Sequence, residues 1–250
     1  MGGVALLRIE DIDRMRCRPD FVAAVFKDLH WLGLSYPEPV RVQSRHFDDY
    51  RAAADQLRAK GLIYPCFCSR AEIRQASGGQ TDPEGAPLYP GTCRHLPAAE
   101  RMEKLRSGRP VQWRLDMSQA IENIGEIEIM EAMPTPVNAP GPRRADPGRW
   151  GDVVLVRKDT PTSYHLSVVV DDAIQGITHV TRGMDLYAST DIHALLQRLF
   201  GLPAPVYTHH ALIVGADAEK LSKSRGSESL AGLRALGITP ADIRAQLADF

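Results

Sequence analysis

The stretch from residue 152 to residue 201 alternates short apolar runs with segments of helical periodicity, and this order constrains the fold most strongly. Residues 152–157 and 177–181 are apolar runs typical of buried strands. In residues 160–176 apolar side chains stand at i, i+3, i+4, i+7 and i+8, which predicts a helix despite three consecutive valines. Residues 189–201 predict a second helix that ends at a glycine. The expected N-caps are Thr160 and Ser189. Alternating strands and helices form largely parallel sheets, so we expect an α/β fold.

The N-terminal part has similar elements, whereas the middle of the chain differs in texture. Residues 6–9 predict a strand, Pro19 begins a helix that ends at Gly33, and residues 47–60 predict another helix. Within 69–148 we expect loops at 77–90 and 133–147, a helix at 98–105 and a strand at 111–117. We expect residues 1–68 and 149–205 to form the two halves of a nucleotide-binding domain, with residues 69–148 inserted between them. Residues 206–250 should form a loop and a helical segment capped by Thr239.

Composition describes an ordinary globular protein. The chain has 250 residues, 44% hydrophobic content and a formal net charge of −1, so an RNA contact requires a local basic patch. Arg143, Arg144 and Arg149 are candidates for such a patch, or a solvated loop. No apolar run is long enough to span a membrane, and the N-terminus is unlike an export signal. We therefore expect a cytoplasmic monomer with reduced cysteines.

A lysine-rich loop near the C-terminus suits a polyphosphate. Lys220-Leu221-Ser222-Lys223-Ser224 places two ammonium groups beside two hydroxyls, after a glycine and an aspartate that favour a loop. Such groups can offset the negative charge that develops when a phosphate bond breaks. A solvated surface loop is the alternative interpretation.

Three stretches together resemble one family. The lysine loop resembles the KMSKS signature of class I aminoacyl-tRNA synthetases. Residues 7–14 resemble the "RIEDTD" segment of the glutamyl-type enzymes, and residues 161–183 are similar to their glutamate-pocket stretch. The resemblance implies a class I synthetase Rossmann-type parallel sheet with an inserted zinc-containing α+β subdomain. It also implies L-glutamate and ATP, with Mg²⁺, as reactants.

The length of the chain indicates a branch of this family. Only 26 residues follow Ser224, which leaves no room for an anticodon domain. This resembles the glutamyl-queuosine tRNA(Asp) synthetases, which attach glutamate to queuosine at the wobble position of tRNA(Asp). Nothing like the family's first strand and His-x-Gly-His-type motif precedes Arg8, so we expect an N-terminally truncated fold that activates glutamate poorly or not at all. The alternatives are a truncated glutamyl-tRNA synthetase charging tRNA(Glu) and an inactive module that binds tRNA or zinc.

Three clustered cysteines suggest a metal site. Cys66 and Cys68 are separated by one residue, which disfavours a disulfide between them but allows a shared metal. Structural zinc prefers four ligands, and Cys93 supplies a third thiol. The family resemblance implies Tyr89 as the fourth ligand, with His95 as the alternative. The other interpretation is three buried free thiols, and the isolated Cys17 is expected to be a small packed residue.

The resemblance also implies roles for pocket residues. Arg182 follows an expected strand, where ligands bind in parallel sheets, and its guanidinium suits a carboxylate. Glu10 is expected to bind the ammonium group of glutamate, and Tyr164 to donate its hydroxyl. Lys220 and Lys223 are the expected catalytic groups, Lys223 also binding ATP. Residues expected on the adenosine side are Asp185 and Tyr187.

Overall fold

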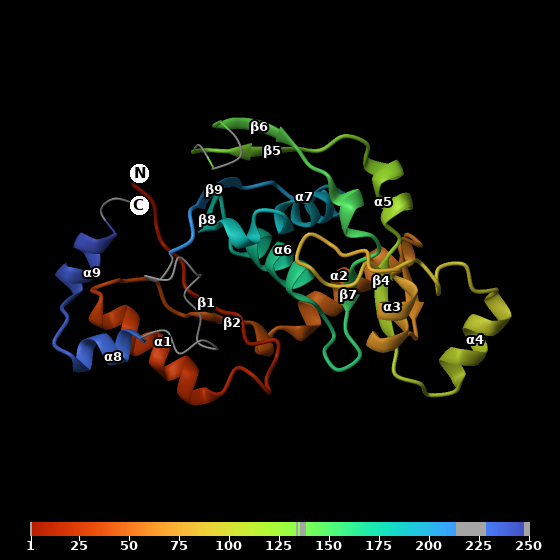
Figure 1. The fold of residues 1–250 in the computed structure, drawn as a ribbon, viewed down its shortest axis with the longest axis horizontal. Helices are drawn as coiled ribbons and strands as arrows, with labels where there is room; N and C mark the ends of the chain where they lie inside the picture. Colours follow the sequence, from red (N-terminus) through yellow and green to blue (C-terminus); the bar gives the residue numbers. More distant parts are fainter. Residues whose placement is uncertain (1, 134, 136–138, 214–228, 248–250) are drawn as a thin grey trace. The chain divides into compact units, whose positions relative to one another are not determined.

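The computed structural model describes residues 2–133, 135, 139–213 and 229–247. The chain divides into two compact units, one made of residues 1–45 and 210–250 and the other of residues 46–209. Each unit combines helices with short strands (Figure 1).

In its described residues, the first unit contains a parallel pair of short strands and three helices. Strand β1 (Arg8–Ile9) pairs with β2 (Arg41–Val42), and β2 runs into a 3₁₀ turn, η1 (Gln43–Arg45). Helix α1 (Pro19–Trp31) begins with proline at its first turn and is followed by Gly33, whose φ of 73° favours glycine. The C-terminal helices are α8 (Leu230–Ala235) and α9 (Pro240–Gln246).

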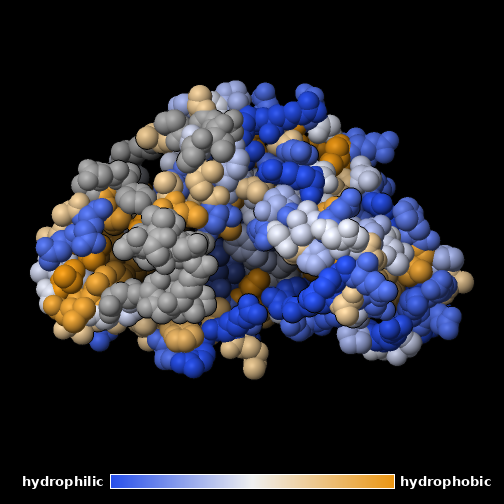
Figure 2. Space-filling model, viewed as in Figure 1, coloured by the Kyte–Doolittle hydropathy of each residue, from blue (hydrophilic) through white to orange (hydrophobic). Residues whose placement is uncertain are grey.

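Two features of the first unit stand out. Thr239 caps α9, and together with Asp242 it forms the reciprocal hydrogen bonds of a capping box, which confirms the predicted helix start. Hydrophobic residues gather on the visible surface around α8 and α9 (Figure 2), where Leu236 is 72% exposed. Helix α1 buries no residue fully, so its apolar stripe stays partly open to solvent within this unit.

One sheet of the second unit is antiparallel. It consists of β3 (Ile63–Cys66), β4 (Gln112–Leu115) and β7 (Val154–Val156), with β4 in the centre. The helices that precede or connect these strands along the chain are α2 (Phe47–Ala59), α3 (Arg70–Ala76), α4 (Ala98–Arg106), α5 (Met117–Ile124) and the 3₁₀ turn η2 (Pro147–Trp150). The central β4 thus joins strands from both sides of the segment 69–148.

The other sheet of the second unit has the strand order β6-β5-β9-β8. Its strands are β5 (Glu128–Glu131), β6 (Gly141–Arg144), β8 (His179–Gly183) and β9 (Val206–His210). Strand β5 pairs antiparallel with β6 and parallel with β9. The associated helices are α6 (Tyr164–Ile174), η3 (Met184–Leu186) and α7 (Ser189–Phe200).

The core of the second unit lies where α6 packs against α2 and α7. Leu57, Leu166 and Leu195 are fully buried there. A buried polar contact crosses the same region, because the Tyr50 hydroxyl donates to the Asp171 carboxylate at 2.9 Å. Apolar packing and this hydrogen bond together hold α6, which carries one wall of the site described below.

Several sequence predictions hold, and others need correction. Residues 164–174, within the predicted range 160–176, are helical rather than extended. Ser163 and not Thr160 is the N-cap of α6, since the Ser163 hydroxyl accepts from the Leu166 N–H. Ser189 is the first residue of α7 rather than its cap, and its hydroxyl donates to Glu84 at 2.7 Å. The predicted strand 111–117 ends at Leu115, because Asp116 caps α5.

The largest correction concerns the sheets. A largely parallel sheet was expected, whereas β3-β4-β7 and the β5-β6 pair are antiparallel. The expected loop 133–147 contains β6, which pairs antiparallel with β5. The expected strand 177–181 lies two residues later as β8, so Arg182 is inside the strand. In the described residues no helix is long and apolar enough to cross a bilayer.

Candidate functional site

The Arg182 guanidinium is held by three uncharged side chains. Its Nε donates to Nε2 of His209 at 3.2 Å, one terminal nitrogen lies 3.2 Å from Nδ1 of His193, and the other donates to Oγ1 of Thr190 at 2.5 Å. Its Cζ also lies 5.3 Å from the ring centroid of Tyr207. Among the described residues, no carboxylate forms an ion pair with Arg182.

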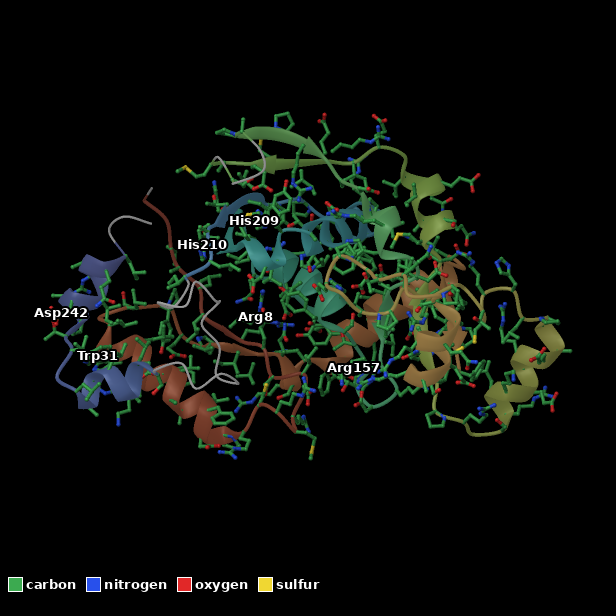
Figure 3. The ribbon with its side chains drawn as sticks, in the orientation of Figure 1. Arg8, Trp31, Arg157, His209, His210 and Asp242 are labelled. Atoms are coloured by element: carbon green, nitrogen blue, oxygen red, sulfur yellow. The ribbon has the colours of Figure 1, made fainter. Side chains whose placement is uncertain are left out.

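These contacts come from three elements that the fold brings together. Arg182 is on β8, Thr190 and His193 are in the first turns of α7, and His209 is on β9, as Figure 3 shows for His209. Strands β8 and β9 are neighbours, and α7 connects them along the chain. The guanidinium therefore has a fixed setting at one edge of the sheet.

A buried chain of alternating charges continues from His209. Glu131 Oε2 lies 3.0 Å from His209 Nδ1, and Glu131 Oε1 accepts from Arg143 Nε at 3.1 Å. Arg143 also donates to Asp191 at 2.8 Å, and the second oxygen of Asp191 accepts from Arg149 at 2.7 Å. The side chains of Glu131 and His209 are 0% exposed, so these groups satisfy one another rather than solvent.

Tyr164 lies at the start of α6, beside two histidine rings. Its ring centroid is 5.6 Å from that of His165 and 5.5 Å from that of His193. His165 Nδ1 lies 3.2 Å from His193 Nε2, and His193 reaches Arg182 through its other ring nitrogen. Burial, and secondarily the charge of Arg182, lower the pKa of His165 to about 4, so its ring is neutral near pH 7.

Glu10 belongs to the first unit. It follows β1 and pairs with Arg8, its Oε1 lying 3.2 Å from an Arg8 terminal nitrogen. Its backbone carbonyl accepts from the Cys17 thiol at 3.7 Å. Cys17 also lines a cavity of about 500 Å³ between β1, α1 and residues 38–45, so it is less tightly packed than expected.

The other expected ligand-binding residues have varied settings. Lys220 and Lys223 lie outside the described residues. Asp185 is exposed in η3. The Tyr187 ring contacts the His209 ring at 5.1 Å and lies under the Arg143 guanidinium at 4.2 Å, which makes it part of the buried network.

A second cluster joins three thiols and a phenol. The sulfurs of Cys66, Cys68 and Cys93 all lie within 4.8 Å of one another, with 3.5 Å between Cys68 and Cys93. The Tyr89 hydroxyl lies 3.9 Å from the Cys68 sulfur and accepts from the Cys93 N–H at 2.7 Å. A tetrahedral zinc with Zn–S distances of about 2.3 Å separates its sulfurs by about 3.8 Å. The spacing and chemistry of these donors therefore fit a zinc ion.

The acidity of the thiol cluster is uneven. Hydrogen bonding with Cys93, opposed by burial, lowers the pKa of Cys66 to about 4, while the same interaction raises the pKa of Cys93. Burial raises the pKa of Tyr89. His95 is exposed, and its Nε2 accepts from Arg94, so it does not join the cluster. The geometry favours Tyr89 over His95 as the fourth donor.

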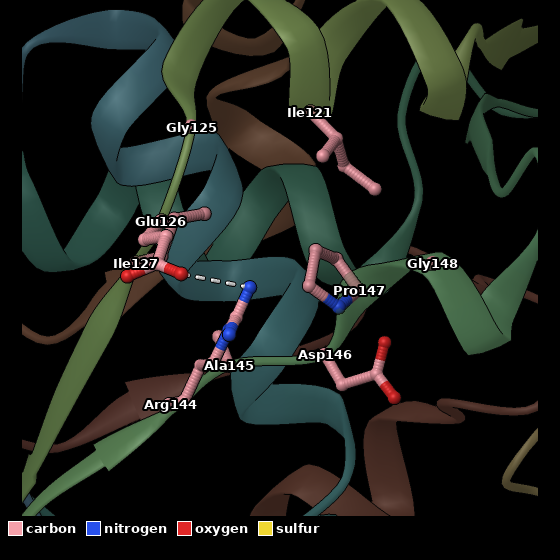
Figure 4. A pocket seen from close by; sticks show the side chains of 9 residues that line it. All are labelled: Ile121, Gly125, Glu126, Ile127, Arg144, Ala145, Asp146, Pro147 and Gly148. Atoms are coloured by element: carbon pink, nitrogen blue, oxygen red, sulfur yellow. Dashed lines mark ion pairs between the residues drawn. The ribbon is translucent and has the colours of Figure 1, made fainter.

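The three arginines expected to form a basic patch do not act as one. Arg143 is almost buried in the network with Glu131 and Asp191, and Arg149 also pairs with Asp191. Arg144 is 73% exposed and pairs with Glu126 at 3.0 Å beside a pocket of about 370 Å³ (Figure 4). The prediction of an arginine patch is wrong for Arg143, because burial of its guanidinium requires carboxylate partners.

Sequence reasoning missed most of the groups around Arg182. Thr190 and His193 are on α7, His209 is on β9 and Glu131 is on β5, and none of them belongs to a short motif. Only the histidines carried a signal, because a polar ring within an apolar segment such as 192–200 needs a partner.

Comparison with known proteins identifies the family. The model of "tRNA synthetases class I (E and Q), catalytic domain" matches residues 1–247, and the chain belongs to this family. It is therefore a ligase of the aminoacyl-tRNA synthetase type. The chain is 43% identical over 249 residues to a protein from Rhodobacter capsulatus named glutamyl-Q tRNA(Asp) synthetase, covering 97% of this chain and 87% of that protein. A protein of the same name from Symbiobacterium thermophilum is 41% identical, with 99% and 76% covered.

A solved structure agrees with this assignment. The glutamate-tRNA synthetase of Elizabethkingia anophelis superimposes with a TM-score of 0.73 and 27% sequence identity. The match covers 90% of this chain and 47% of that chain. The class I synthetase α/β fold expected from the sequence is thereby confirmed.

Proposed function

We propose that the protein activates glutamate with ATP and transfers it to queuosine in tRNA(Asp). The relatives that carry the name glutamyl-Q tRNA(Asp) synthetase match almost the whole chain at 41–43% identity. We also propose that the protein acts in the cytoplasm as a monomer, since its proposed partner is tRNA.

One observation carries the amino-acid part of the proposal. Arg182 is a partly buried cation that makes three hydrogen bonds, to His209, His193 and Thr190, which are uncharged acceptors. Arginine has five N–H donors, so two remain for a ligand. Two parallel N–H donors suit a carboxylate, which would also balance the charge of Arg182. Glutamate carries two carboxylates and therefore fits this position.

The remaining residues support a two-step reaction. A carboxylate oxygen of glutamate attacks the α-phosphorus of ATP, pyrophosphate leaves, and an aminoacyl adenylate forms. A hydroxyl of queuosine then attacks the adenylate carbonyl, AMP leaves, and an ester remains. Tyr164 orients the amino acid, Glu10 takes its ammonium group, and Lys220 and Lys223 offset charge on pyrophosphate; Mg²⁺ would add further positive charge for the phosphates of ATP.

The thiol cluster has a structural role in this proposal. Cys66, Cys68, Cys93 and Tyr89 would hold one zinc, whose bonds tie the end of β3 to the loop that precedes α4. A closed set of four protein ligands leaves no position for a reactant, which is typical of structural zinc. The zinc would stabilise an inserted subdomain in residues 69–148 rather than take part in glutamate transfer.

The chief alternative is a glutamyl-tRNA synthetase that charges tRNA(Glu). The solved glutamate-tRNA synthetase is 27% identical to this chain, whereas the relatives named glutamyl-Q tRNA(Asp) synthetase are 41–43% identical, which weakens this alternative. Transfer of labelled glutamate should be measured on purified tRNA(Asp) and tRNA(Glu). We expect a base-labile product on tRNA(Asp) alone, and none after periodate has destroyed the queuosine diol. Product on tRNA(Glu), or on periodate-treated tRNA(Asp), would contradict the proposal.

A further inference from the structure

The orientation of the Arg182 guanidinium depends on a neighbouring ring that can exist in two forms. Neutral histidine carries one proton, on either Nδ1 or Nε2, and only the nitrogen without the proton accepts a hydrogen bond. His209 Nε2 faces both the Nε–H of Arg182, at 3.2 Å, and the hydroxyl of Thr190, at 3.1 Å. Arginine cannot accept, so the contact with Arg182 exists only if His209 Nε2 is free of its proton.

Glu131 supplies the group that selects this form. Its Oε2 lies 3.0 Å from His209 Nδ1, and its other oxygen accepts from Arg143 at 3.1 Å. A carboxylate has no proton to donate, so it can only accept from His209, as it does from Arg143. The proton of His209 must then sit on Nδ1.

We infer that Glu131 and His209 are positioning residues that hold Arg182 ready for the substrate carboxylate. Glu131 fixes the proton of His209 on Nδ1, His209 Nε2 fixes the Nε–H of Arg182, and Thr190 receives the adjacent terminal nitrogen. The two N–H groups left over, one on each terminal nitrogen, then remain for the substrate carboxylate. This inference rests on the proposed role of Arg182 and adds two residues from β5 and β9 to the glutamate site.

The charge pattern supports this arrangement. From the surface inward the groups are Arg149, Asp191, Arg143 and Glu131, in which each cation faces an anion. Arg182 follows across the neutral ring of His209 and is the last cation, with no anion beside it among the described residues. A substrate carboxylate would complete the alternation, whereas a neutral amide would not. The network therefore favours an acid over its amide at this position.

The test replaces each member of the relay in the full chain. Glu131→Gln keeps the shape but can donate as well as accept, so it no longer selects one form of His209. His209→Leu removes the acceptor, and His209→Gln restores an oxygen near the position of Nε2. Glu128→Gln is the matched control, because Glu128 is exposed on the same strand.

The first readout is glutamate-dependent pyrophosphate exchange. We expect Glu131→Gln and His209→Leu to raise the KM for glutamate by about 10–100-fold, by analogy with the loss of an outer-shell partner that orients a metal-binding residue, with kcat little changed. Glu128→Gln should match the wild type, and His209→Gln should recover most of the loss. A KM in Glu131→Gln equal to that of Glu128→Gln would overturn the inference.

The second readout does not depend on activity. Long-range ¹H–¹⁵N spectra of the wild type should show His209 protonated on Nδ1, and the Arg182 Nε–H should exchange slowly with water. In Glu131→Gln the Arg182 Nε–H should exchange faster, while Glu128→Gln should not differ from the wild type. A proton on Nε2 of His209 in the wild type refutes the relay. If Arg182→Ala leaves the KM for glutamate unchanged, the proposed function of Arg182 fails, and these spectra alone decide the relay.

Discussion

Replacing Cys66 and Cys93 together with serine should remove the zinc from the protein. The two side chains supply two of the three thiols, and both are buried, at 0% and 5% exposed. The double variant would keep only Cys68 and Tyr89, whose sulfur and oxygen lie 3.9 Å apart, and two ligands are too few for a tetrahedral ion. Metal analysis should find one zinc per wild-type chain and close to none in the double variant.

The contribution of Tyr89 to zinc binding can be measured separately from its contribution to folding. Tyr89→Phe removes the hydroxyl that accepts from the buried Cys93 N–H at 2.7 Å, so it costs about 1–3 kcal/mol of folding free energy with or without zinc. Zinc affinity in a chelator competition is therefore the informative quantity. We expect Tyr89→Phe to weaken zinc by more than the roughly 10–100-fold typical of losing an outer-shell partner.

His95→Ala is the matched control for this experiment, because His95 is exposed and lies two residues after Cys93. It should retain the affinity of the wild type. Full zinc occupancy in the Cys66→Ser, Cys93→Ser double variant would refute the site. Loss of zinc in His95→Ala but not in Tyr89→Phe would refute only the choice of the fourth ligand.

Two further predictions concern the substrate site and the core. Arg182→Ala should weaken the binding of glutamate by roughly 2–5 kcal/mol, measured by glutamate-dependent pyrophosphate exchange. Lys223→Ala should instead lower turnover, with little change in the KM for glutamate. Equal losses of glutamate binding in both variants, or any loss in the exposed control Arg198→Ala, would contradict these roles. Tyr50→Phe should lower the free energy of unfolding by about 1.5–3 kcal/mol, because it removes a hydrogen bond to the buried Asp171 carboxylate; chemical denaturation measures this, and an unchanged midpoint would contradict it.

The helices could be predicted from the sequence better than the sheets. Helical periodicity is local, and it located α1, α2, α6 and α7 to within a few residues. Strand pairing depends on contacts distant in sequence. Nothing local to residues 112–115 shows that they lie between β3 and β7, because the alternation of side chains is the same for parallel and antiparallel neighbours.

One part of the candidate site was also predictable from the sequence, and another part was not. Cys66, Cys68, Tyr89 and Cys93 were predicted as a group, and the structure brings their side chains together. The surroundings of Arg182 were not predictable, because Glu131 and His209 are 78 residues apart and meet only through the pairing of β5 with β9. Arg143 was assigned to the surface for a related reason, since its burial depends on carboxylates that no motif marks.

Protonation of His165 should make the protein less stable in mild acid. Its ring packs against Trp150 and Tyr164 and is hydrogen-bonded to His193. Burial is the main factor that disfavours a positive charge on this ring, and the nearby Arg182 cation is the second.

Its pKa of about 4 lies below the ordinary value of 6.5, so the unfolded chain binds the proton more readily than the folded chain between these values. Stability is therefore fully present above pH 6.5 and falls as the pH drops toward 4, by about 3 kcal/mol at most. Carboxylates titrate in the same pH range and also change the stability of the protein. The free energy of unfolding should therefore be measured against pH for the wild type and for His165→Gln, and the two curves compared. The variant should lose less stability between pH 6.5 and 4, with the exposed His179→Gln behaving as the wild type. Parallel curves for the wild type and His165→Gln would show that His165 does not resist protonation in the folded protein.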